Sequence, residues 1–210
     1  MTMLELFLAG ARVIREAITD RAAVEAWDEP SVLEEQTVGS LAGHLARTGS
    51  FILGEILALG EPDRPIDFPT VADFYVTLLP TAEDPIHEGI RQRGAALAAQ
   101  GPDGLAATID AQMPGIEAQL RARPGDSKLE VTGGNVMTVD EYLVSRVVEQ
   151  VVHLDDLARS VAHDPWPLPA GSYTTVARVA VDVALLRHEP HLVVRGLYRR
   201  GHADFVLPAL

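Results

Sequence analysis

Apolar residues recur at every third or fourth position along most of this chain, the spacing that places them on one face of an α-helix. The pattern predicts helices over residues 4–27, 37–59, 71–100, 103–122, 138–162 and 172–188, with the third of them interrupted at Pro80 and Pro85. The alternation typical of a β-strand is nearly absent, apart from a short extended piece at residues 129–132. Several long helices with so few strand signals favour an all-α protein built as a helical bundle.

Proline, glycine and capping residues mark the ends of the predicted helices. Thr138 followed by Glu141 forms the sequence pattern of a capping box and is the best-marked helix start in the chain. Gly101 and Pro102 are expected to end the helix that precedes them. Pro114 lies inside the next helical pattern, so the sequence leaves the continuity of that helix open.

The chain is strongly acidic, with 17 Lys and Arg residues against 30 Asp and Glu residues and a formal net charge of −13. A nucleic-acid partner is therefore not expected, because binding to a phosphate backbone needs a basic surface. Hydrophobic residues make up 47% of the 210 residues, which is enough to bury a sizeable core. Aromatic residues contribute only 5%, so we expect that core to be aliphatic.

Cysteine is absent, which excludes disulfides, cysteine-ligated zinc, Fe–S clusters and a cysteine nucleophile. Any thiol used in chemistry must therefore come from another molecule. Residues 1–9 are apolar but contain Glu5 and lack a basic start, unlike a signal peptide. No stretch reaches the roughly 20 apolar residues of a membrane span. We expect a cytoplasmic protein with no membrane partner.

The most informative polar pair is Glu149 and His153, four residues apart in the helix predicted over residues 138–162. Residues at this spacing differ by only about 40° around the helix axis and about 6 Å along it, so their side chains can reach one metal ion. An imidazole and a carboxylate suit Zn²⁺, Ni²⁺ or Fe²⁺. A solvated polar strip would show the same spacing, although the apolar residues on either side leave this strip narrow.

Three further polar residues, Tyr142, Arg146 and Asp156, share this helix face and are candidates to support the ligands or bind substrate. A third ligand must come from another helix, and His44 is the candidate, because its helical neighbours are mostly apolar and predict an inward orientation. A buried histidine with an ordinary hydrogen-bond partner is the alternative. Gly43 beside it would let another helix or a ligand approach closely.

Two parts of the chain resemble one known family. Residues 26–31 (AWDEPS) and 37–46 (TVGSLAGHLA) resemble the entry to the second helix of the mycothiol-dependent maleylpyruvate isomerase N-terminal family. Residues 146–157 (RVVEQVVHLDDL) resemble its R-x-x-E-x-x-x-H-x-x-D-L helix. That family belongs to the DinB-like (YfiT-like) metal-binding four-helix bundles. The resemblance implies such a bundle over residues 1–163 and leaves 164–210 as a C-terminal helical extension with room for a small strand.

In that family, a histidine of the second helix and the late Glu/His pair bind one divalent metal, usually zinc. The resemblance therefore implies His44, Glu149 and His153 as metal ligands, with Ni²⁺ and Fe²⁺ as alternatives to zinc. It also implies mycothiol, the low-molecular-weight thiol of actinobacteria, as a co-substrate whose metal-bound thiolate attacks a small electrophilic substrate. The chain would then be a mycothiol-type isomerase or S-transferase.

The tail departs from the isomerase that it resembles, whose larger C-terminal α/β domain contributes an arginine for substrate carboxylates. The tail arginines are Arg178, Arg187, Arg195, Arg199 and Arg200, and the sequence does not indicate which of them, if any, contacts substrate. Two other functions stay open, a metallohydrolase with a metal-bound water as nucleophile and a non-catalytic metal-binding bundle. The tail either covers the cavity mouth or mediates a homodimer, and the sequence leaves both open.

Overall fold

The computed structural model describes residues 1–78 and 86–199. This part of the chain is mainly helical, which confirms the all-α prediction, and its sheet is a single two-stranded antiparallel hairpin. The elements in chain order are α1 (Met3–Ile18), α2 (Arg21–Glu25), α3 (Val38–Ala46), the π-helical η1 (Arg47–Phe51), α4 (Ile52–Ala58), α5 (Val71–Leu78), α6 (Ile86–Ala98), α7 (Gly101–Arg121), β1 (Lys128–Val131), the 3₁₀-helical η2 (Thr132–Gly134), β2 (Asn135–Thr138), α8 (Val139–Ser160), α9 (Ala170–Arg187) and α10 (Pro190–Tyr198).

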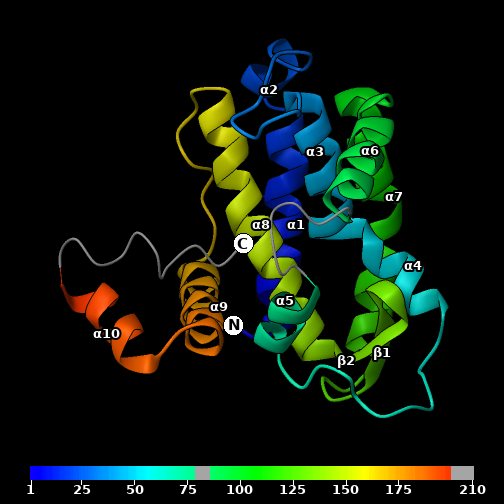
Figure 1. Cartoon of the computed structure of the whole chain (residues 1–210). Helices are drawn as coiled ribbons and strands as arrows, with labels where there is room; N and C mark the ends of the chain where they lie inside the picture. The colour runs from blue at the N-terminus through cyan, green and yellow to red at the C-terminus, as the bar shows by residue number, and fades with distance from the viewer. Residues whose placement is uncertain (79–85, 200–210) are drawn as a thin grey trace.

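Four helical segments form the centre of the molecule, namely α1, the continuous rod α3–η1–α4, α7 and α8 (Figure 1). Each segment turns an apolar face toward the others. The side chains that fill the space between them are mostly aliphatic and include Phe7, Ile14, Leu41, Leu53, Leu105 and Leu143. Helix α6 packs on α3, while α5 and α9 pack on α8 and on each other. The bundle therefore has the aliphatic core that the composition predicts.

Helix α6 approaches α3 very closely at the turn that carries His44. A Cβ atom on Gly43 would lie 2.4 Å from the carbonyl oxygen of Gly94, and one on Gly94 would lie 2.7 Å from the carbonyl oxygen of Ser40. The two facing glycines thus let the helix backbones touch. The close approach expected at Gly43 is made by α6, which fixes the turn of α3 that presents His44.

Helix α8 begins where the capping pattern predicts. Thr138 is the N-cap, and its side-chain oxygen accepts a hydrogen bond from the backbone N–H of Glu141 at 3.3 Å. The carboxylate of Glu141 in turn accepts a hydrogen bond from the backbone N–H of Val71 at 2.7 Å. Because Val71 is the first residue of α5, one glutamate fixes the start of α5 against α8.

Two of the predicted helices differ from a single regular α-helix in the structure. The helix predicted over residues 4–27 is two helices, because Thr19 ends α1 and the Asp20 carboxylate caps α2 by accepting the backbone N–H of Ala22. The helix predicted over residues 37–59 is continuous but contains the π-helical turn η1 in its middle. No proline in the sequence marks either the end of α1 or the π-helical turn.

Proline and glycine act differently in α7 from the sequence expectation. Gly101, at φ +71°, ends the preceding helix as expected, but Pro102 lies in the first turn of α7, where its missing N–H costs nothing. Helix α7 then continues through Pro114. Pro114 is exposed, so the backbone carbonyl that loses its helical partner there can be hydrated.

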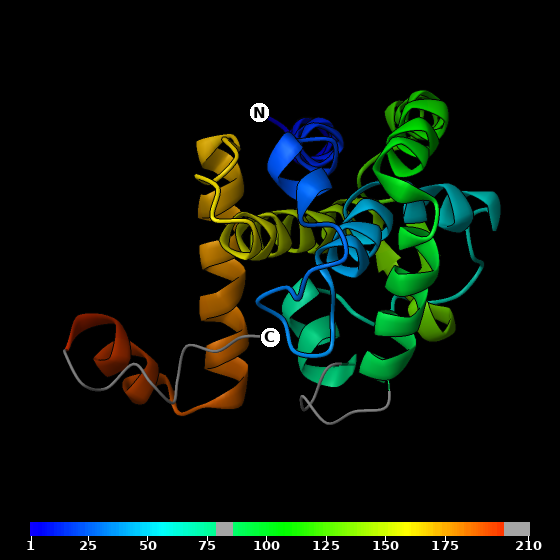
Figure 2. The same cartoon turned by 90° about the horizontal axis from the view of Figure 1, so that it is seen from above.

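The extended piece predicted at residues 129–132 is strand β1, and the sequence did not predict its partner β2. The helix predicted over residues 172–188 is confirmed as α9, but α10 was not predicted. Helix α10 contacts α9 and stands apart from the bundle (Figure 2). Residues 164–199 contain the two helices α9 and α10 and no strand, and 200–210 lie outside the described part of the chain. None of the described helices combines the length and hydropathy needed to cross a bilayer.

Candidate metal centre

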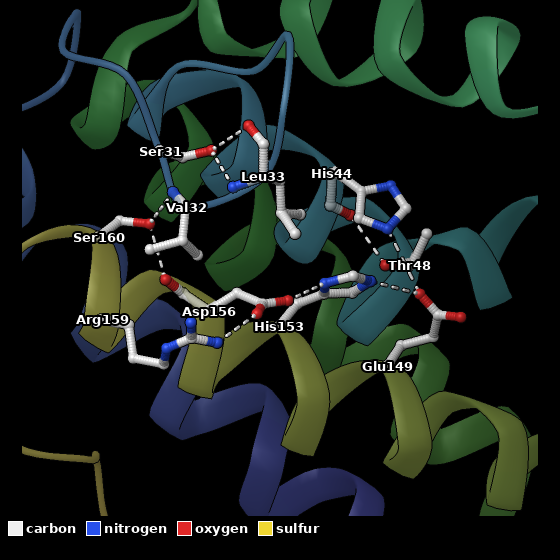
Figure 3. A network of polar contacts seen from close by, with 10 residues as sticks. All are labelled: Ser31, Val32, Leu33, His44, Thr48, Glu149, His153, Asp156, Arg159 and Ser160. Atoms are coloured by element: carbon white, nitrogen blue, oxygen red, sulfur yellow. Dashed lines mark hydrogen bonds and ion pairs between the residues drawn. The ribbon is translucent and has the colours of Figure 1, made fainter. Parts of the chain in front are cut away.

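The structure brings together the three residues that the sequence selects as metal ligands (Figure 3). His44 extends from α3, and Glu149 and His153 extend from successive turns of α8. The Nε2 atoms of His44 and His153 lie 3.3 Å and 3.5 Å from Oε2 of Glu149. One donor atom of each residue lies within 4.8 Å of the other two. Their side chains are 11–19% exposed, so they form a sheltered cluster rather than a solvated strip.

The donor set of this cluster suits a divalent metal. Two imidazole nitrogens and one carboxylate oxygen form a set found in catalytic zinc sites. A tetrahedral zinc ion with bonds of about 2.0–2.2 Å holds neighbouring ligand atoms roughly 3.3 Å apart. The two nitrogen–oxygen distances of 3.3 Å and 3.5 Å therefore match the edges of such a tetrahedron. The residues present thus fit a zinc-sized cation with one coordination position left for another molecule.

A second carboxylate orients His153 from the opposite side of its ring. Nδ1 of His153 lies 3.0 Å from Oδ2 of Asp156, and an ionised carboxylate can only accept, so Nδ1–H donates. This hydrogen bond keeps the proton on Nδ1, so that Nε2, on the side of Glu149, is the nitrogen that would lose its proton when a metal ion binds. Asp156 itself is 9% exposed. The arrangement is the carboxylate–histidine pair that commonly supports metal-binding imidazoles.

The mutual contacts of the cluster set the protonation of its members. Burial lowers the pKa of His44, although Glu149 opposes this change. Burial opposes ionisation of Glu149, but hydrogen bonds from His153 and His44 and the charge of Arg146 hold its pKa well below the usual value. Burial also lowers the pKa of His153, yet its contacts with Asp156 and Glu149 outweigh this and raise its pKa to about 9. The cluster thus holds an ionised carboxylate between one neutral and one protonated imidazole at neutral pH.

Arg146 and Tyr142, the other two predicted supporting residues, lie one and two turns before Glu149. Arg146 is 5% exposed, and its guanidinium donates to the Thr48 carbonyl at 3.2 Å and to the Ser145 hydroxyl at 3.1 Å. The guanidinium carbon lies 4.6 Å from the centroid of the Tyr142 ring. Asp156 therefore contacts one of the three donors, His153, directly, whereas Arg146 acts on Glu149 through its charge.

Two supporting features were missed at the sequence level. The π-helical turn η1 begins three residues after His44, and its Thr48 carbonyl accepts the hydrogen bond from Arg146. Gln150 is buried, and its side-chain amide donates to the carbonyls of Gly49 and Phe7 at 2.7 Å and 2.9 Å. Gln150 thereby ties α8 to η1 and α1. The sequence signals for these two features were Gly49 in the middle of a predicted helix and Gln150, an amide side chain between valines.

Three of the described tail arginines, Arg178, Arg195 and Arg199, lie elsewhere than at the three donors. Arg178 lines an open groove of about 650 Å³ beside Asp73 and Glu141. Arg195 and Arg199 are exposed, at α10 and at its C-cap. Arg200 lies outside the described residues. The structure singles out none of these arginines as a substrate ligand.

Replacing Asp156 with asparagine should weaken metal binding without removing a ligand. The neutral amide no longer favours the donating Nδ1–H of His153, so we expect a loss of about 10–100-fold in zinc affinity. The pKa of His153 in the metal-free protein should also fall from about 9, because the contact with Asp156 contributes to raising it. Zinc titration against a competing chelator and histidine NMR measure the two effects.

The matched control for Asp156→Asn is Asp155→Asn, which makes the same chemical change on the exposed neighbouring residue. We expect Asp155→Asn to leave both zinc affinity and the pKa of His153 unchanged. Equal effects of the two substitutions would mean that the net charge of α8, and not the hydrogen bond to His153, controls the cluster.

Comparison with known proteins gives one match. The family model described as the mycothiol maleylpyruvate isomerase N-terminal domain matches residues 8–158. The matched range contains His44, Glu149 and His153 together with Asp156, Arg146 and Tyr142. No curated protein and no solved structure matches the chain.

Proposed function

The chain belongs to the mycothiol maleylpyruvate isomerase N-terminal domain family, and from this membership we propose that it is a metal-dependent enzyme using a thiol of the mycothiol type. It would transfer that thiol to a small electrophile or use it to isomerise one. The observation that carries the proposal is the convergence of two imidazole nitrogens on one buried carboxylate oxygen, at 3.3 Å and 3.5 Å. His44, Glu149 and His153 would hold the cation, for which zinc is our first choice.

A divalent cation bound by these three residues would favour the deprotonated form of a thiol that binds beside it. The protein supplies the remaining electrostatics. Glu149 contributes one negative charge, and Asp156 keeps the Nε2 lone pair of His153 directed toward the centre. The positive charge of the buried Arg146 helps to lower the pKa of Glu149, so the carboxylate stays ionised at neutral pH.

The chemistry proposed for the thiol is a simple bond exchange. The thiolate sulfur donates an electron pair to an electrophilic carbon and forms a C–S bond. In a transfer reaction, a leaving group departs with the bonding pair, or a conjugated double bond accepts the pair and then a proton. In an isomerisation, the pair returns after the carbon–carbon bond has rotated, and the C–S bond breaks. No net oxidation or reduction occurs in either case.

A metallohydrolase on the same bundle is the second candidate. Two imidazoles and one carboxylate also form the donor set of zinc sites that activate water, with one position left for it. A non-catalytic metal-binding bundle is the third. The metal content of the purified protein tests the metal assignment that all three candidates share, since each should contain about one divalent ion per chain.

Cobalt substitution tests the choice between thiol and water. Adding mycothiol to the Co²⁺ protein should change the visible spectrum of the cobalt, because a thiolate sulfur would enter its coordination. S-methylated mycothiol is the control, since the rest of the molecule is the same but the thiol is replaced by a thioether that cannot ionise. An unchanged spectrum at saturating mycothiol would reject the thiol proposal and favour the hydrolase.

A further inference from the structure

A small apolar pocket lies between helices α5, α8 and α9, and α8 is also the helix that carries Glu149 and His153. Its volume is about 240 Å³. It is lined by Tyr75 of α5, Val148 and Val152 of α8, and the α9 residues Val176, Val179, Ala180 and Val183. We call this space the valine pocket. Four of its seven lining residues come from α9, which lies outside the range matched by the family model.

Two residues that line the valine pocket are sequence neighbours of two donors on α8. Val148 directly precedes Glu149, and Val152 directly precedes His153. The two valines and the two donors therefore form parallel rows along the helix, separated by about 100° around its axis. Tyr75 of α5 lines the pocket, and its phenol is hydrogen-bonded to the backbone of α8 at Ser145, one turn before Glu149.

The lining of the pocket contains no ionisable acid, amine, guanidinium or amide among the described residues. Its one polar group is the hydroxyl of Tyr75, which already donates to the backbone carbonyl of Ser145 at 3.2 Å. A carboxylate placed in this pocket would lose its hydration without gaining a partner, which costs several kcal/mol. An alkyl or aryl group would instead gain from leaving water. The pocket therefore discriminates against a dicarboxylate and in favour of an apolar group.

We propose that the valine pocket binds the apolar part of the substrate, so that this protein acts on electrophiles carrying an alkyl or aryl group beside the reacting carbon. The reaction in this proposal rests on the proposed function, whereas the binding of an apolar group in the pocket does not depend on it. The pocket has the volume of about eight water molecules in the liquid, which limits the apolar group to roughly eight non-hydrogen atoms. Helix α9, which supplies four of the seven lining residues, would thereby help to determine which substrates this protein accepts.

A series of straight-chain alkanethiols, from ethanethiol to octanethiol, measures the distance from the donors to the pocket. Each thiol is titrated into the full-length Co²⁺ protein, and its affinity is read from the cobalt spectrum. We expect the affinity to rise about fourfold for each added methylene that enters the pocket, and then to level off when the pocket is full. An affinity independent of chain length would overturn the pocket proposal and leave the thiol proposal standing.

Two variants of α9 should move the point at which the affinity levels off. Ala180→Leu reduces the free volume, so the plateau should come at a shorter chain, and Val176→Ala enlarges it, so the plateau should come at a longer one. Val181→Ala is the matched control, because Val181 is a half-buried valine of the same helix that does not line the pocket. A plateau that stays in place in both pocket variants would also overturn the proposal.

A second measurement separates failure of the pocket from failure of the thiol chemistry. If no thiol changes the cobalt spectrum, the thiol proposal fails, and n-alkanols then probe the metal-free protein by NMR. Chain-length-dependent binding that Ala180→Leu weakens at least fivefold would support the pocket without any thiol. Absence of chain-length-dependent binding of the alkanols would reject it.

Discussion

His153→Ala is expected to abolish stoichiometric metal binding while leaving the helical content of the protein nearly unchanged. The substitution removes one of three donors and leaves a pair, His44 and Glu149, whose atoms approach to 3.3 Å. Changes to residues that only support a ligand already cost 10–100-fold in metal affinity, so loss of a ligand should cost more than 100-fold. Alanine is the best helix former, and α8 should therefore remain intact. Metal analysis after dialysis and far-UV circular dichroism give the two readouts.

The control for His153→Ala is His163→Ala, a histidine that stacks on the Trp166 ring at 4.5 Å between centroids. It should retain about one metal ion per chain. Glu149→Ala should behave like His153→Ala, because it removes the oxygen on which both imidazoles converge. Full metal occupancy in either ligand variant would refute the assignment of the three donors, and so would a loss of metal in His163→Ala as large as that in His153→Ala.

The parts of the fold that follow from local sequence could be predicted, and those that depend on tertiary contacts could not. Helix α8 has a strong cap at Thr138 and a continuous periodic pattern, so its start and length are local properties. The π-helical turn η1 is different, because its carbonyls at Thr48 and Gly49 are satisfied by Arg146 and Gln150 about a hundred residues later. No short stretch of sequence contains that information.

The candidate site divides in the same way. The spacing of Glu149 and His153 on one helix indicates convergence, because four residues bring two side chains to one face. His44 was selected as the third ligand because its helical neighbours predict an inward orientation, and the resemblance to a family then supported that choice. The local pattern does not show which face of α3 meets α8. The valine pocket could not be predicted from the sequence either, because it depends on the tertiary packing of α9 against α8.

Gly43→Ala is expected to destabilise the protein by about 1–2 kcal/mol, although alanine is favoured over glycine in a helix. The added Cβ would lie 2.4 Å from the Gly94 carbonyl oxygen, 3.1 Å from the backbone nitrogen of Ala98 and 3.2 Å from Cβ of Leu97. The nearest of these contacts is with backbone, so relief requires α6 to move away from α3. An approach this close to backbone belongs to the upper part of the roughly 1–3 kcal/mol that overpacking costs, which leaves a net loss of about 1–2 kcal/mol after the gain of about 1 kcal/mol from helix propensity.

Gly115→Ala makes the same chemical change where the added atom would meet nothing within 4 Å, so it should stabilise the protein by about 1 kcal/mol. Opposite signs of the two effects in urea unfolding would establish that contact with α6 restricts residue 43. Gly43→Ala should also lower zinc affinity, because the displaced turn carries His44, whereas Gly115→Ala should not. Stabilisation by both alanines, with zinc affinity unchanged, would contradict the view that the packing of α6 on α3 positions this ligand.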